Sequence, residues 1–435
     1  MIPMHDYKFL PTDTNTYFGY DQSGYINLIV EYGSSSDCPF IVVAKNDQEA
    51  LHLITDLNFF LSGSSIHYFP DLEVLAYDQE MPSSALVSKR GRIFHALMSG
   101  KKIDIIVTTA NALIRKNAGI EHWLDSVITL SVGQKFNFDE IKYQLNNINY
   151  KEILLIDDFG QYSFRNNIFD IYPIGESSAY RIIIAEDGKI LELKYLNTST
   201  QLSQRSLIQS ITVMPVYEFP FNSNIIPKFR TQWRQRFKNL DHVTSAQQYK
   251  DVTNGIIPHS ACFYMPFFCN TLLSLFDLIP KNATFFFNDE SLNSINKLVE
   301  TVSFRYLDML DINNGFILKP SELWLTETTL FEKLTQHNVN VFSEVNNKNL
   351  NARNITINGI SRFPTIAATI KSLQKWFENV ENVLFVISSD VRDESLRKLL
   401  SFMKVTFMSV NSWGDFCHKG GLCVTRGGLE TGFYD

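Results

Sequence analysis

The chain has 435 residues, more than one ordinary hydrophobic core organises, because single cores stop growing at roughly 250 residues. Hydrophobic residues make up 45% of it and charged residues 20%, the balance of a folded protein with ample apolar area to bury. Its formal net charge of -7 disfavours a non-specific phosphate-binding surface, which draws its affinity from clustered lysine and arginine. We therefore expect several domains, and protein partners in preference to nucleic acid.

Membrane, disulfide and metal classes are also disfavoured. No apolar run approaches the roughly 20 residues needed to cross a bilayer, and the first residues lack the regions of a signal peptide, so we expect a cytoplasmic protein without a membrane partner. The five cysteines are odd in number and form no CxxC pair. Cys417, His418 and Cys423 are conceivable ligands, but such residues are more often ordinary thiols and surface side chains. We expect no bound metal.

The first part of the chain alternates strands with helices. Residues 39–60 begin with an apolar strand and continue as a helix, in which Ala50, Leu51, Ile54, Leu57 and Phe60 fall at helical spacing. A strand at 66–69, a helix at 84–98 and a strand at 103–109 follow, the last leading into the helical ANALIRK. This alternation predicts a mostly parallel sheet.

After about residue 125 the pattern changes to a short helix followed by strands and turns. The helix carries Ile141, Leu145 and Ile148 on one face. Asn166-Asn167 and Asp187-Gly188 then mark two hairpin turns, since these residues tolerate the backbone conformations that tight turns require. We predict a compact α+β unit at 126–208, inserted into a first domain formed by 1–125 and 209–345.

The resumed first domain contains an aromatic and basic helix at 229–237 and a strand at 283–287. Residues 346–354 are asparagine-rich and almost without apolar side chains, which predicts a linker. Beyond it, 355–435 offers a helix at 366–380, a strand at 383–387, a helix at 392–403 and a strand at 404–410. This pattern indicates a separate small α/β domain.

Two segments suggest phosphate chemistry. Gly19 and Gly24 have the G-x-x-x-x-G spacing of a phosphate-binding loop, but Tyr25 and Ile26 stand where a lysine grips phosphate and a serine or threonine holds Mg²⁺. Asp289 and Glu290 follow an apolar strand, as the carboxylates of many nucleotide hydrolases do. The alternatives are an ordinary loop and solvated acidic residues. Without the lysine, the carboxylates have no magnesium nucleotide to organise.

Other sites are less specific. The sequence contains no HExxH, no GxSxG and no GxGxxG after a strand. Arg230, Trp233 and Arg234 could face nucleic acid, although arginine stems that cover an apolar surface are the commoner use. Arg165 lies beside the Asn-Asn turn and Arg181 opens the next hairpin, but hairpin arginines are usually solvated.

Many stretches, read in order, resemble the N-terminal region of the bacterial transcription-repair coupling factor (Mfd) family. The resemblance extends over nearly the whole chain, and its collinear order makes it specific. Among the segments that carry it are YFPDLEVLAYDQEMPSS, DIIVTTANALI, NYKEILLIDDFGQYSFR, IFDIYPIG, FRTQWRQRF, YKDVTNGIIP, LFVISSDVRDESLRKLL and GLETGFYD.

The resemblance implies an α/β multidomain fold. Residues 1–125 and 209–345 would form a degenerate helicase-type (RecA-like) lobe similar to that of the repair protein UvrB, 126–208 an inserted α+β domain of the UvrA-binding type, and 355–435 a small α/β domain of unknown role. The loop containing Gly19, Gly24, Tyr25 and Ile26 becomes a decayed phosphate loop, and Asp289 and Glu290 a degenerate acidic motif. Residues 77–84 leave no room for the DNA-clamping hairpin of UvrB, so we expect weak DNA binding or none.

The resemblance also implies a partner and a contact site. The UvrA-contacting positions of the family fall on Arg165, Arg181 and Ala185; the third is aromatic in familiar members, and Asn166 replaces a glycine. The implied function is to recruit UvrA of nucleotide excision repair to RNA polymerase stalled at DNA lesions. The polymerase-binding domain and the translocase that uses ATP and Mg²⁺ lie further along the family's polypeptide, so this chain is expected to hold no cofactor and no catalytic residue.

Two alternatives belong to other functional classes. One is a superfamily 2 nucleotide hydrolase that uses an unorthodox phosphate loop, which differs from the binding module at Tyr25 and Ile26. The other is a structural fragment whose last domain only shields or spaces its neighbours.

Overall fold

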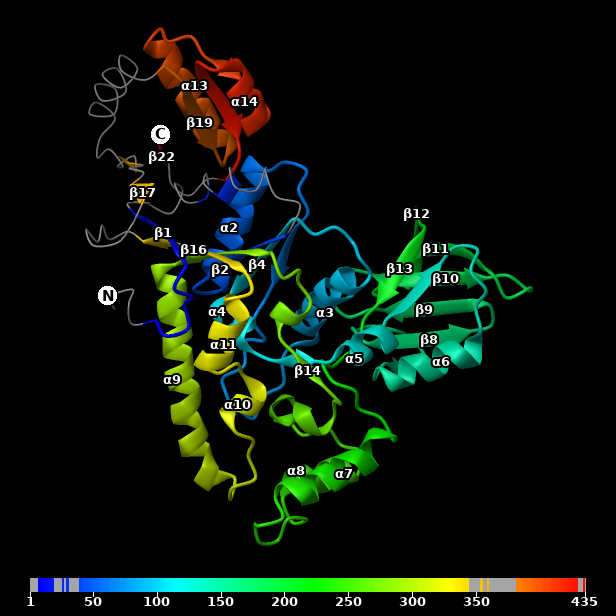
Figure 1. The fold of residues 1–435 in the computed structure, drawn as a ribbon. Helices are drawn as coiled ribbons and strands as arrows, with labels where there is room; N and C mark the ends of the chain where they lie inside the picture. The colour runs from blue at the N-terminus through cyan, green and yellow to red at the C-terminus, as the bar shows by residue number, and fades with distance from the viewer. Residues whose placement is uncertain are drawn as a thin grey trace.

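The computed structural model describes residues 7–18, 26, 29–30, 39–343, 353–354, 358–359, 381–428 and 433–434. Its larger elements gather into three parts (Figure 1): a lobe around a seven-stranded sheet, an insert around a six-stranded sheet, and a C-terminal unit around a three-stranded sheet. Within the described residues, no helix is both long enough and apolar enough to cross a membrane.

The lobe's sheet is parallel throughout, as the alternation of strands and helices predicts. The parallel pairing brings the carboxyl ends of all its strands to one edge. In order across the sheet, the strands are β17 (Arg353–Asn354), β1 (Asn15–Phe18), β16 (Asn338–Ser343), β15 (Thr284–Asn288), β2 (Phe40–Ala44), β4 (Ile105–Thr109) and β3 (Ile66–Phe69).

One part of the predicted linker belongs to this sheet. Residues 346–352 lie outside the described residues, but Arg353 and Asn354 form β17 and pair in parallel with Tyr17 and Phe18 of β1. The linker prediction is wrong for these two residues. Their polar composition fits an edge position, where only one side of the strand is paired.

Alternating strand residues bury both faces of the sheet. One face packs Val42, Val107 and Phe286 against helix α2 (Asp47–Phe60) and the buried Ile26 and Ile29. The opposite face packs its own strand residues against α3 (Ser84–Met98), α4 (Ala110–Ile114), α5 (Ile120–Asp125) and α9 (Asp289–Ile312). Apolar runs on both faces are typical of parallel sheets covered by helices.

Local sequence accounts for the helix starts. Asn46, Ser83 and Asn288 stand immediately before α2, α3 and α9, and the side chain of each accepts a hydrogen bond from the first turn. The predicted helix at 84–98 and strand at 66–69 are confirmed residue for residue. In α2, however, Leu51 is 54% exposed, and Leu53 is buried in its place.

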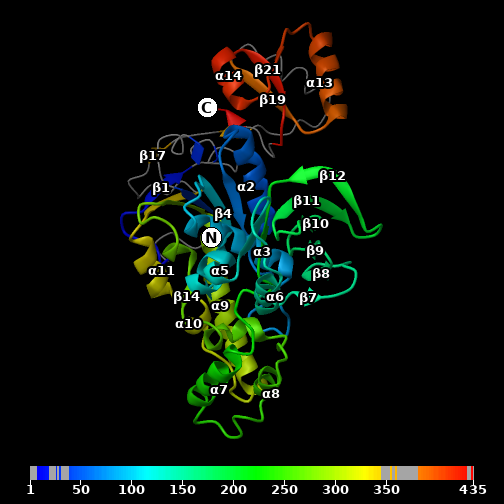
Figure 2. The ribbon, with the colours of Figure 1, turned by 90° about the vertical axis from the view of Figure 1, so that its right-hand side faces the viewer.

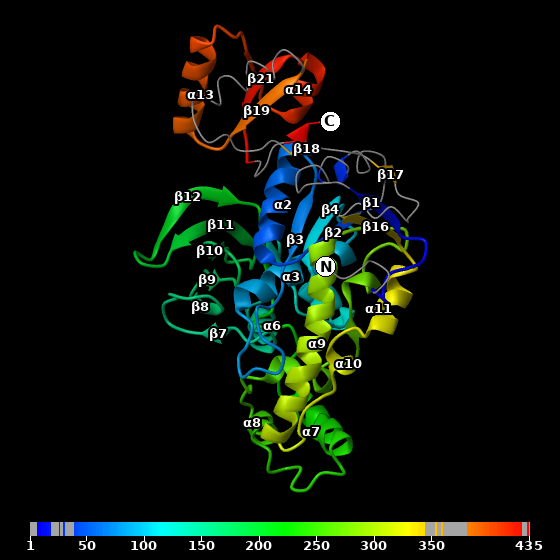
Figure 3. The same cartoon turned by 90° about the vertical axis from the view of Figure 1, so that its left-hand side faces the viewer.

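Helices α7 (Ile225–Arg236) and α8 (Gln247–Thr253) lie at the end of the lobe furthest from the C-terminal unit, while α10 (Pro320–Leu323) and α11 (Glu327–Leu334) lie nearer the sheet (Figure 3). Trp233 of α7 is fully buried in the lobe's core. The Arg234 guanidinium lies 5.5 Å from the centre of the Tyr249 ring, and Arg236 pairs with Glu322 at 2.6 Å. These contacts support the packing interpretation of this helix over the nucleic-acid one.

The passage between β3 and α3 contains no strand. All of residues 70–83 are described, and they cross the core as turns and irregular chain. Tyr77 fixes the passage, since its ring is buried against Phe263 and Trp324 and its hydroxyl donates to the backbone oxygen of Leu318 at 3.0 Å. A clamping hairpin is therefore absent from this passage, as the sequence predicts.

The insert is a six-stranded sheet with one helix packed on one face. Figure 2 shows the strands in order from β12 to β7, beside the lobe's sheet and α3. The bounds are β7 (Lys151–Glu152), β8 (Gln161–Arg165), β9 (Ile168–Tyr172), β10 (Ala179–Ile184), β11 (Ile190–Asn197) and β12 (Leu202–Ile208). Helix α6 (Phe138–Asn147) buries Ile141 and Leu145, with the following Ile148, against Phe169 and Ile171, as its spacing predicts.

Both predicted hairpin turns are present. Asn166 has φ of 52° between β8 and β9, and Gly188 has φ of 81° between β10 and β11. Asparagine and glycine adopt such positive φ angles at the least cost, which is why these turns are visible in the sequence.

The insert ends later than predicted. Strand β13 (Ser210–Val213) pairs antiparallel with β6 (Ile128–Ser131), and Ile211 and Val213 are buried in the insert's core. The sequence assigns 209–213 to the resumed lobe. Pairing with β6 overrides that assignment, because the chain leaves the insert beside the strand by which it enters.

Buried polar contacts fix the two segments by which the chain enters and leaves the insert against the lobe. Arg90 of α3 is fully buried and forms an ion pair with Glu218, Nε to Oε1, at 2.7 Å; it also donates to the backbone oxygen of Pro70 at 2.6 Å and to Asn117. The His122 ring nitrogen Nε2 lies 3.1 Å from the backbone oxygen of Tyr217. The segments before and after the insert are thus joined through α3 and α5.

The C-terminal unit is a small parallel α/β structure, as predicted. Its strands are β19 (Val383–Ile387), β21 (Leu422–Arg426) and β20 (Met408–Ser409) in that spatial order, with helices α13 (Asp390–Phe402) and α14 (Trp413–Lys419). The predicted strand at 404–410 is reduced to Met408 and Ser409, and the predicted helix at 366–380 lies outside the described residues. Trp413 packs on Phe60 of α2 with ring centres 4.9 Å apart.

Candidate functional site

Two arginines of the insert converge on one buried carboxylate. Asp170 of β9 is fully buried, and it lies opposite Arg181 of β10 in the strand register. Arg181 donates from Nε and Nη2 to the two carboxylate oxygens at 2.7 and 2.8 Å, while Arg165 of β8 donates from Nη2 to Oδ2 at 2.6 Å. The fork-shaped guanidinium of Arg181 thus matches the carboxylate in two parallel bonds.

The two arginines differ in what they leave free. The Arg181 side chain is 15% exposed and also donates from Nη1 to the backbone oxygen of Gln201 at 3.2 Å. Its hydrogen bonds to Asp170 raise its pKa above the ordinary arginine value. The Arg165 side chain is 41% exposed, so most of its five N–H donors face solvent. Two cations around one carboxylate leave this three-residue cluster with a net positive charge.

The third predicted contact position lies on the same face of the hairpins. Strand alternation puts Arg181, Ile183 and Ala185 on one side of β10, and Ile183 pairs with Ile168, the partner of Arg165. Ala185 begins the turn, where its backbone N–H donates to Lys189 at 2.8 Å. The three positions named by the sequence therefore share the outward face, opposite to the face that α6 covers.

Sequence reasoning missed Asp170. Its strand reads Ile-Phe-Asp-Ile-Tyr, with one charged residue inside an apolar run. A charge in such a run is buried only when it is paired. That signal, together with arginines on the neighbouring strands, was sufficient to find it.

The acidic motif stands at the carboxyl edge of the lobe's sheet, directly after β15. Asp289 accepts a hydrogen bond from Ser343 Oγ at 2.6 Å, and Glu290 pairs with Lys45 Nζ at 2.5 Å. Lys45 and the nearly buried Glu49 follow β2, and Glu49 accepts a hydrogen bond from Asn288 Nδ2 at 2.8 Å. These carboxylates are engaged by side chains and backbone groups of the protein itself.

The predicted phosphate loop follows β1. Gly19, Gly24 and Tyr25 lie outside the described residues. Ile26 is described, and its side chain is fully buried in the apolar cluster that contains Ile29 and Phe40. An aliphatic side chain in that position offers no ligand to a metal ion.

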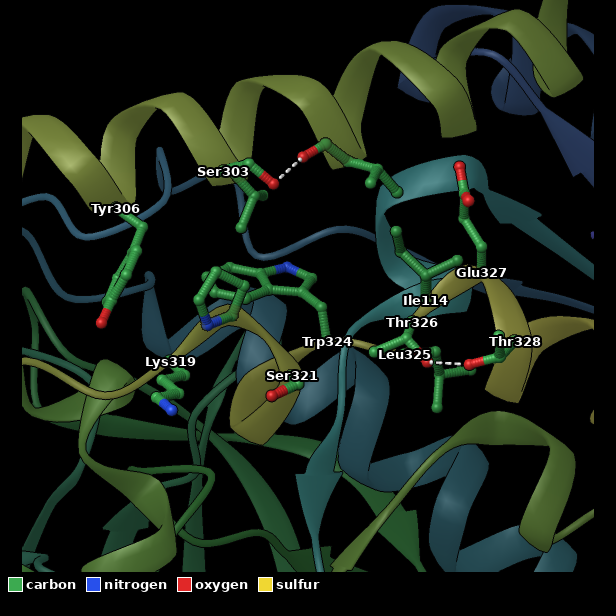
Figure 4. Close-up of a pocket in the computed structure, with 13 residues that line it drawn as sticks. Ile114, Ser303, Tyr306, Lys319, Ser321, Trp324, Leu325, Thr326, Glu327 and Thr328 are labelled. Carbon is green, nitrogen blue, oxygen red and sulfur yellow. Dashed lines mark hydrogen bonds between the residues drawn. The ribbon is translucent and has the colours of Figure 1, made fainter.

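A groove of about 520 Å³ lies between α9, α10 and the chain after Trp324 (Figure 4). Its walls include Ile114, Val302 and Trp324. Three of the hydroxyls that line it bond to neighbours: Ser303 donates to the backbone oxygen of Val299 at 2.8 Å, and the Thr326 and Thr328 hydroxyls lie 2.9 Å apart. The lining residues form no nucleophile and base pair.

Among the described residues, no group of three histidine, cysteine, aspartate or glutamate side chains could hold a metal ion. Cys262 and Cys269 are buried in the lobe, and burial raises the pKa of their thiols to about 11 and about 12. They are therefore packing residues in their thiol form.

Comparison with known proteins gives two domain matches. The UvrB interaction domain matches residues 128–219, which contain both arginines and Asp170, and the D3 domain of MFD matches residues 377–435. The chain is also 24% identical over 421 residues to the transcription-repair coupling factor of Escherichia coli (strain K12), covering 94% of this chain and 36% of that protein. The chain is therefore similar, over most of its length, to transcription-repair coupling factors.

Two other members of the family show the same extent of similarity. The factor of Haemophilus influenzae is 25% identical over 86% of this chain and 32% of its own length, and that of Rickettsia bellii is 27% identical over 69% of this chain and 27% of its own length. The chain thus spans about a third of the length of the Escherichia coli and Haemophilus influenzae factors.

Proposed function

We propose that this chain recruits UvrA, through the outward face of its insert, to RNA polymerase stalled at DNA lesions, and that it does so without nucleotide chemistry of its own. The observation that carries the proposal is the arginine pair fixed on Asp170 within the matched UvrB interaction domain. A pre-oriented guanidinium loses little freedom on binding, so its hydrogen bonds to a partner's carboxylate are not offset by ordering costs.

The arginines have different roles in this proposal. Arg165, the more exposed, contacts a carboxylate of UvrA, and Arg181 holds Asp170 and the turn around Gln201 in place. Ala185 lies on the same face and supplies little contact area, so this chain binds UvrA more weakly than relatives with an aromatic residue there.

The lobe, into which residues 126 to about 213 are inserted, serves as a degenerate RecA-like scaffold. Two observations support this assignment: β1 and β15 lie in one parallel sheet, and the acidic motif follows β15 at the edge where open α/β sheets bind ligands. Buried Ile26 and the internal partners of Asp289 and Glu290 support the loss of nucleotide binding. We further propose that DNA binds this chain weakly or not at all, since the passage at 70–83 has no clamping hairpin.

The experiment is a titration of purified UvrA with the 435-residue chain and three variants. Arg165→Ala should weaken binding about thirtyfold, the fold-change for roughly 2 kcal/mol at an interface anchor. Arg165→Lys should recover little of it, because an ammonium group cannot make the two-bond fork. Arg392→Ala, which removes an exposed arginine of α13, should bind as the unaltered chain does. Equal affinity for all four proteins would contradict the proposal.

A further inference from the structure

The segment between β7 and β8, residues 153–159, lies over the outward face of the insert's sheet beside the arginine pair. Ile156 is fully buried against Ala179 and Leu196, and Ile153 packs beside it. The inner side of the segment is thus apolar and seated on the sheet.

The outer side of the same segment is also apolar. Leu154 is 86% exposed, Leu155 54% and Phe159 46%. Single exposed apolar residues are ordinary on a protein surface, but here Leu154 and Leu155 are adjacent, and Phe159 of the same short segment packs on Tyr172 with ring centres 4.4 Å apart. Exposed apolar residues grouped in this way on a fixed backbone indicate an interaction surface.

Hydrogen bonds from the sheet fix this backbone. Three outward-facing residues of β8, at alternate positions, each hold one part of the surface. Gln161 Oε1 accepts from the backbone N–H groups of Asp157 and Asp158 at 2.9 and 3.1 Å, and Ser163 Oγ donates to the backbone oxygen of Leu154 at 2.9 Å. The third of these residues is Arg165, which donates a hydrogen bond to Asp170.

The segment and the arginine pair form one connected network. Ser163 lies directly opposite Asp170 in the strand register. On the other side, Arg181 donates to the backbone oxygen of Gln201 at 3.2 Å, and Gln201 Nε2 donates to that of Ile156 at 3.0 Å. Gln201 has φ of 58°, so its turn is held in a conformation that this network requires.

A cation, apolar side chains and carboxylates therefore follow one another along β8. Arg165 stands at one end, Leu154 and Leu155 lie in the middle, and the exposed Asp157 and Asp158 lie at the other end. Four residue steps along the strand separate Gln161 from Arg165, which is roughly 14 Å at about 3.4 Å per residue. All three parts fit well within the footprint of one protein interface, about 800 Å² on each partner.

We propose that residues 153–159 and Arg165 form one three-part docking surface, which takes a protein strip that presents a carboxylate, then apolar side chains, then a cation. This inference rests on the proposed function, because it assigns the strip to the UvrA surface that Arg165 contacts. The leucines supply the apolar contact area that Ala185 lacks, and the two aspartates fix the direction in which the strip lies.

The test compares UvrA affinity for the 435-residue chain with that of Leu154→Ser, the pair Asp157→Lys with Asp158→Lys, and a matched control. Leu307→Ser removes a leucine that is 65% exposed on α9 of the lobe. Leu154→Ser should weaken binding about tenfold, chiefly through faster dissociation. The double variant, Asp157→Lys with Asp158→Lys, should weaken UvrA binding by slowing association in low salt. Added salt should reduce its difference from the unaltered chain. Leu307→Ser should change neither rate.

The affinity measurements distinguish failure of this inference from failure of the proposed function. If Arg165→Ala weakens UvrA binding while Leu154→Ser and the double variant leave it unchanged, the three-part surface is wrong and the proposed function stands. If Arg165→Ala also leaves it unchanged, both are wrong. A loss in Leu307→Ser as large as in Leu154→Ser would also overturn the inference, because apolar exposure in general would then explain it. Because Leu154, Asp157, Asp158 and Leu307 are exposed, thermal melts of the variants at these positions should match the unaltered chain.

Discussion

Asp170 joins Arg165 and Arg181, which lie on different strands, into one hydrogen-bonded cluster. It lies fully buried between β8 and β10, and its two oxygens accept the three hydrogen bonds that orient the guanidinium groups. A buried carboxylate is costly to desolvate unless it is paired, and here the pairing also determines what Arg165 presents to solvent.

Removing the charge of Asp170 should therefore lower both stability and binding. In Asp170→Asn the two arginines face each other without a counter-charge, and we expect the free energy of unfolding to fall by about 3 kcal/mol, as when one partner of a buried ion pair is removed. Urea denaturation measures this. Asp187→Asn, at an exposed acid in the neighbouring turn, is the control and should leave the denaturation midpoint unchanged. A midpoint for Asp170→Asn equal to that of the control would show that the carboxylate is not needed.

The position of Ala185 gives a prediction in the opposite direction. Ala185→Phe places an aromatic ring at a partly exposed position on the face that carries Arg165 and Arg181. We expect UvrA to bind this variant several-fold more tightly, since an aromatic anchor adds contact area with few rotatable bonds to order. Calorimetric titration measures the change. Weaker binding by a variant that folds normally would remove Ala185 from the interface.

At the scale of elements, the sequence predicts structure well where the signals are local. Helix α3 and strand β3 have the predicted bounds, because a capping serine and an apolar run mark their ends. Pairing between distant segments is not visible in the same way. Strand β13 joins the insert because it meets β6, and β17 forms from asparagine-rich chain because it meets β1. Leu51 is exposed because α2 turns Leu53 toward the sheet.

The buried contact of His122 with Tyr217, between the segments before and after the insert, should make the free energy of unfolding depend on pH. Burial lowers the pKa of His122 to about 4, from an ordinary value of 6.5, although its contact with the Tyr217 backbone oxygen raises it slightly. Between these two pH values the unfolded chain binds a proton at this residue and the folded chain does not. Stability is therefore lost as the pH falls from 6.5 towards 4, and the loss at pH 5 is about 2 kcal/mol.

Replacing this histidine isolates its contribution. In His122→Gln, which keeps a donor for Tyr217, the free energy of unfolding should fall by about 2 kcal/mol less between pH 7 and pH 5 than in the unaltered chain. Urea denaturation at both pH values gives the difference. His418→Gln, at an exposed position in α14, should keep the original dependence. Identical dependence in His122→Gln and the unaltered chain would mean that His122 is protonated in the folded state.

At the scale of the whole molecule, the lobe's sheet is parallel, and the carboxylates described at its carboxyl edge are engaged by contacts within the protein. The convergence of Arg165 and Arg181 on one face could be anticipated, because the resemblance names these particular residues, whereas the loss of phosphate chemistry stays a prediction. Their common partner Asp170, and the pairing of Glu290 with Lys45 from 245 positions away, depend on tertiary packing and were not predictable.

Because contacts within the protein engage the carboxylates at the carboxyl edge of the lobe's sheet, we predict that magnesium ATP does not bind this chain. Tyr25 replaces the cation that would balance the γ-phosphate, and buried Ile26 provides no ligand for the metal. Isothermal titration of the 435-residue chain with magnesium ATP should therefore give no saturable heat at millimolar nucleotide. Saturable micromolar binding that is lost on substitution of Lys45 would revive the hydrolase alternative.

The central claim is that Arg165, held on Asp170, is an anchor for UvrA. The most direct measurement is the equilibrium affinity of UvrA for Arg165→Ala set against Arg392→Ala, with thermal melts to show that both variants fold. The account predicts a loss of about thirtyfold for Arg165→Ala and none for Arg392→Ala. An affinity for Arg165→Ala equal to that of the unaltered chain would contradict it and place any UvrA interface elsewhere on the molecule.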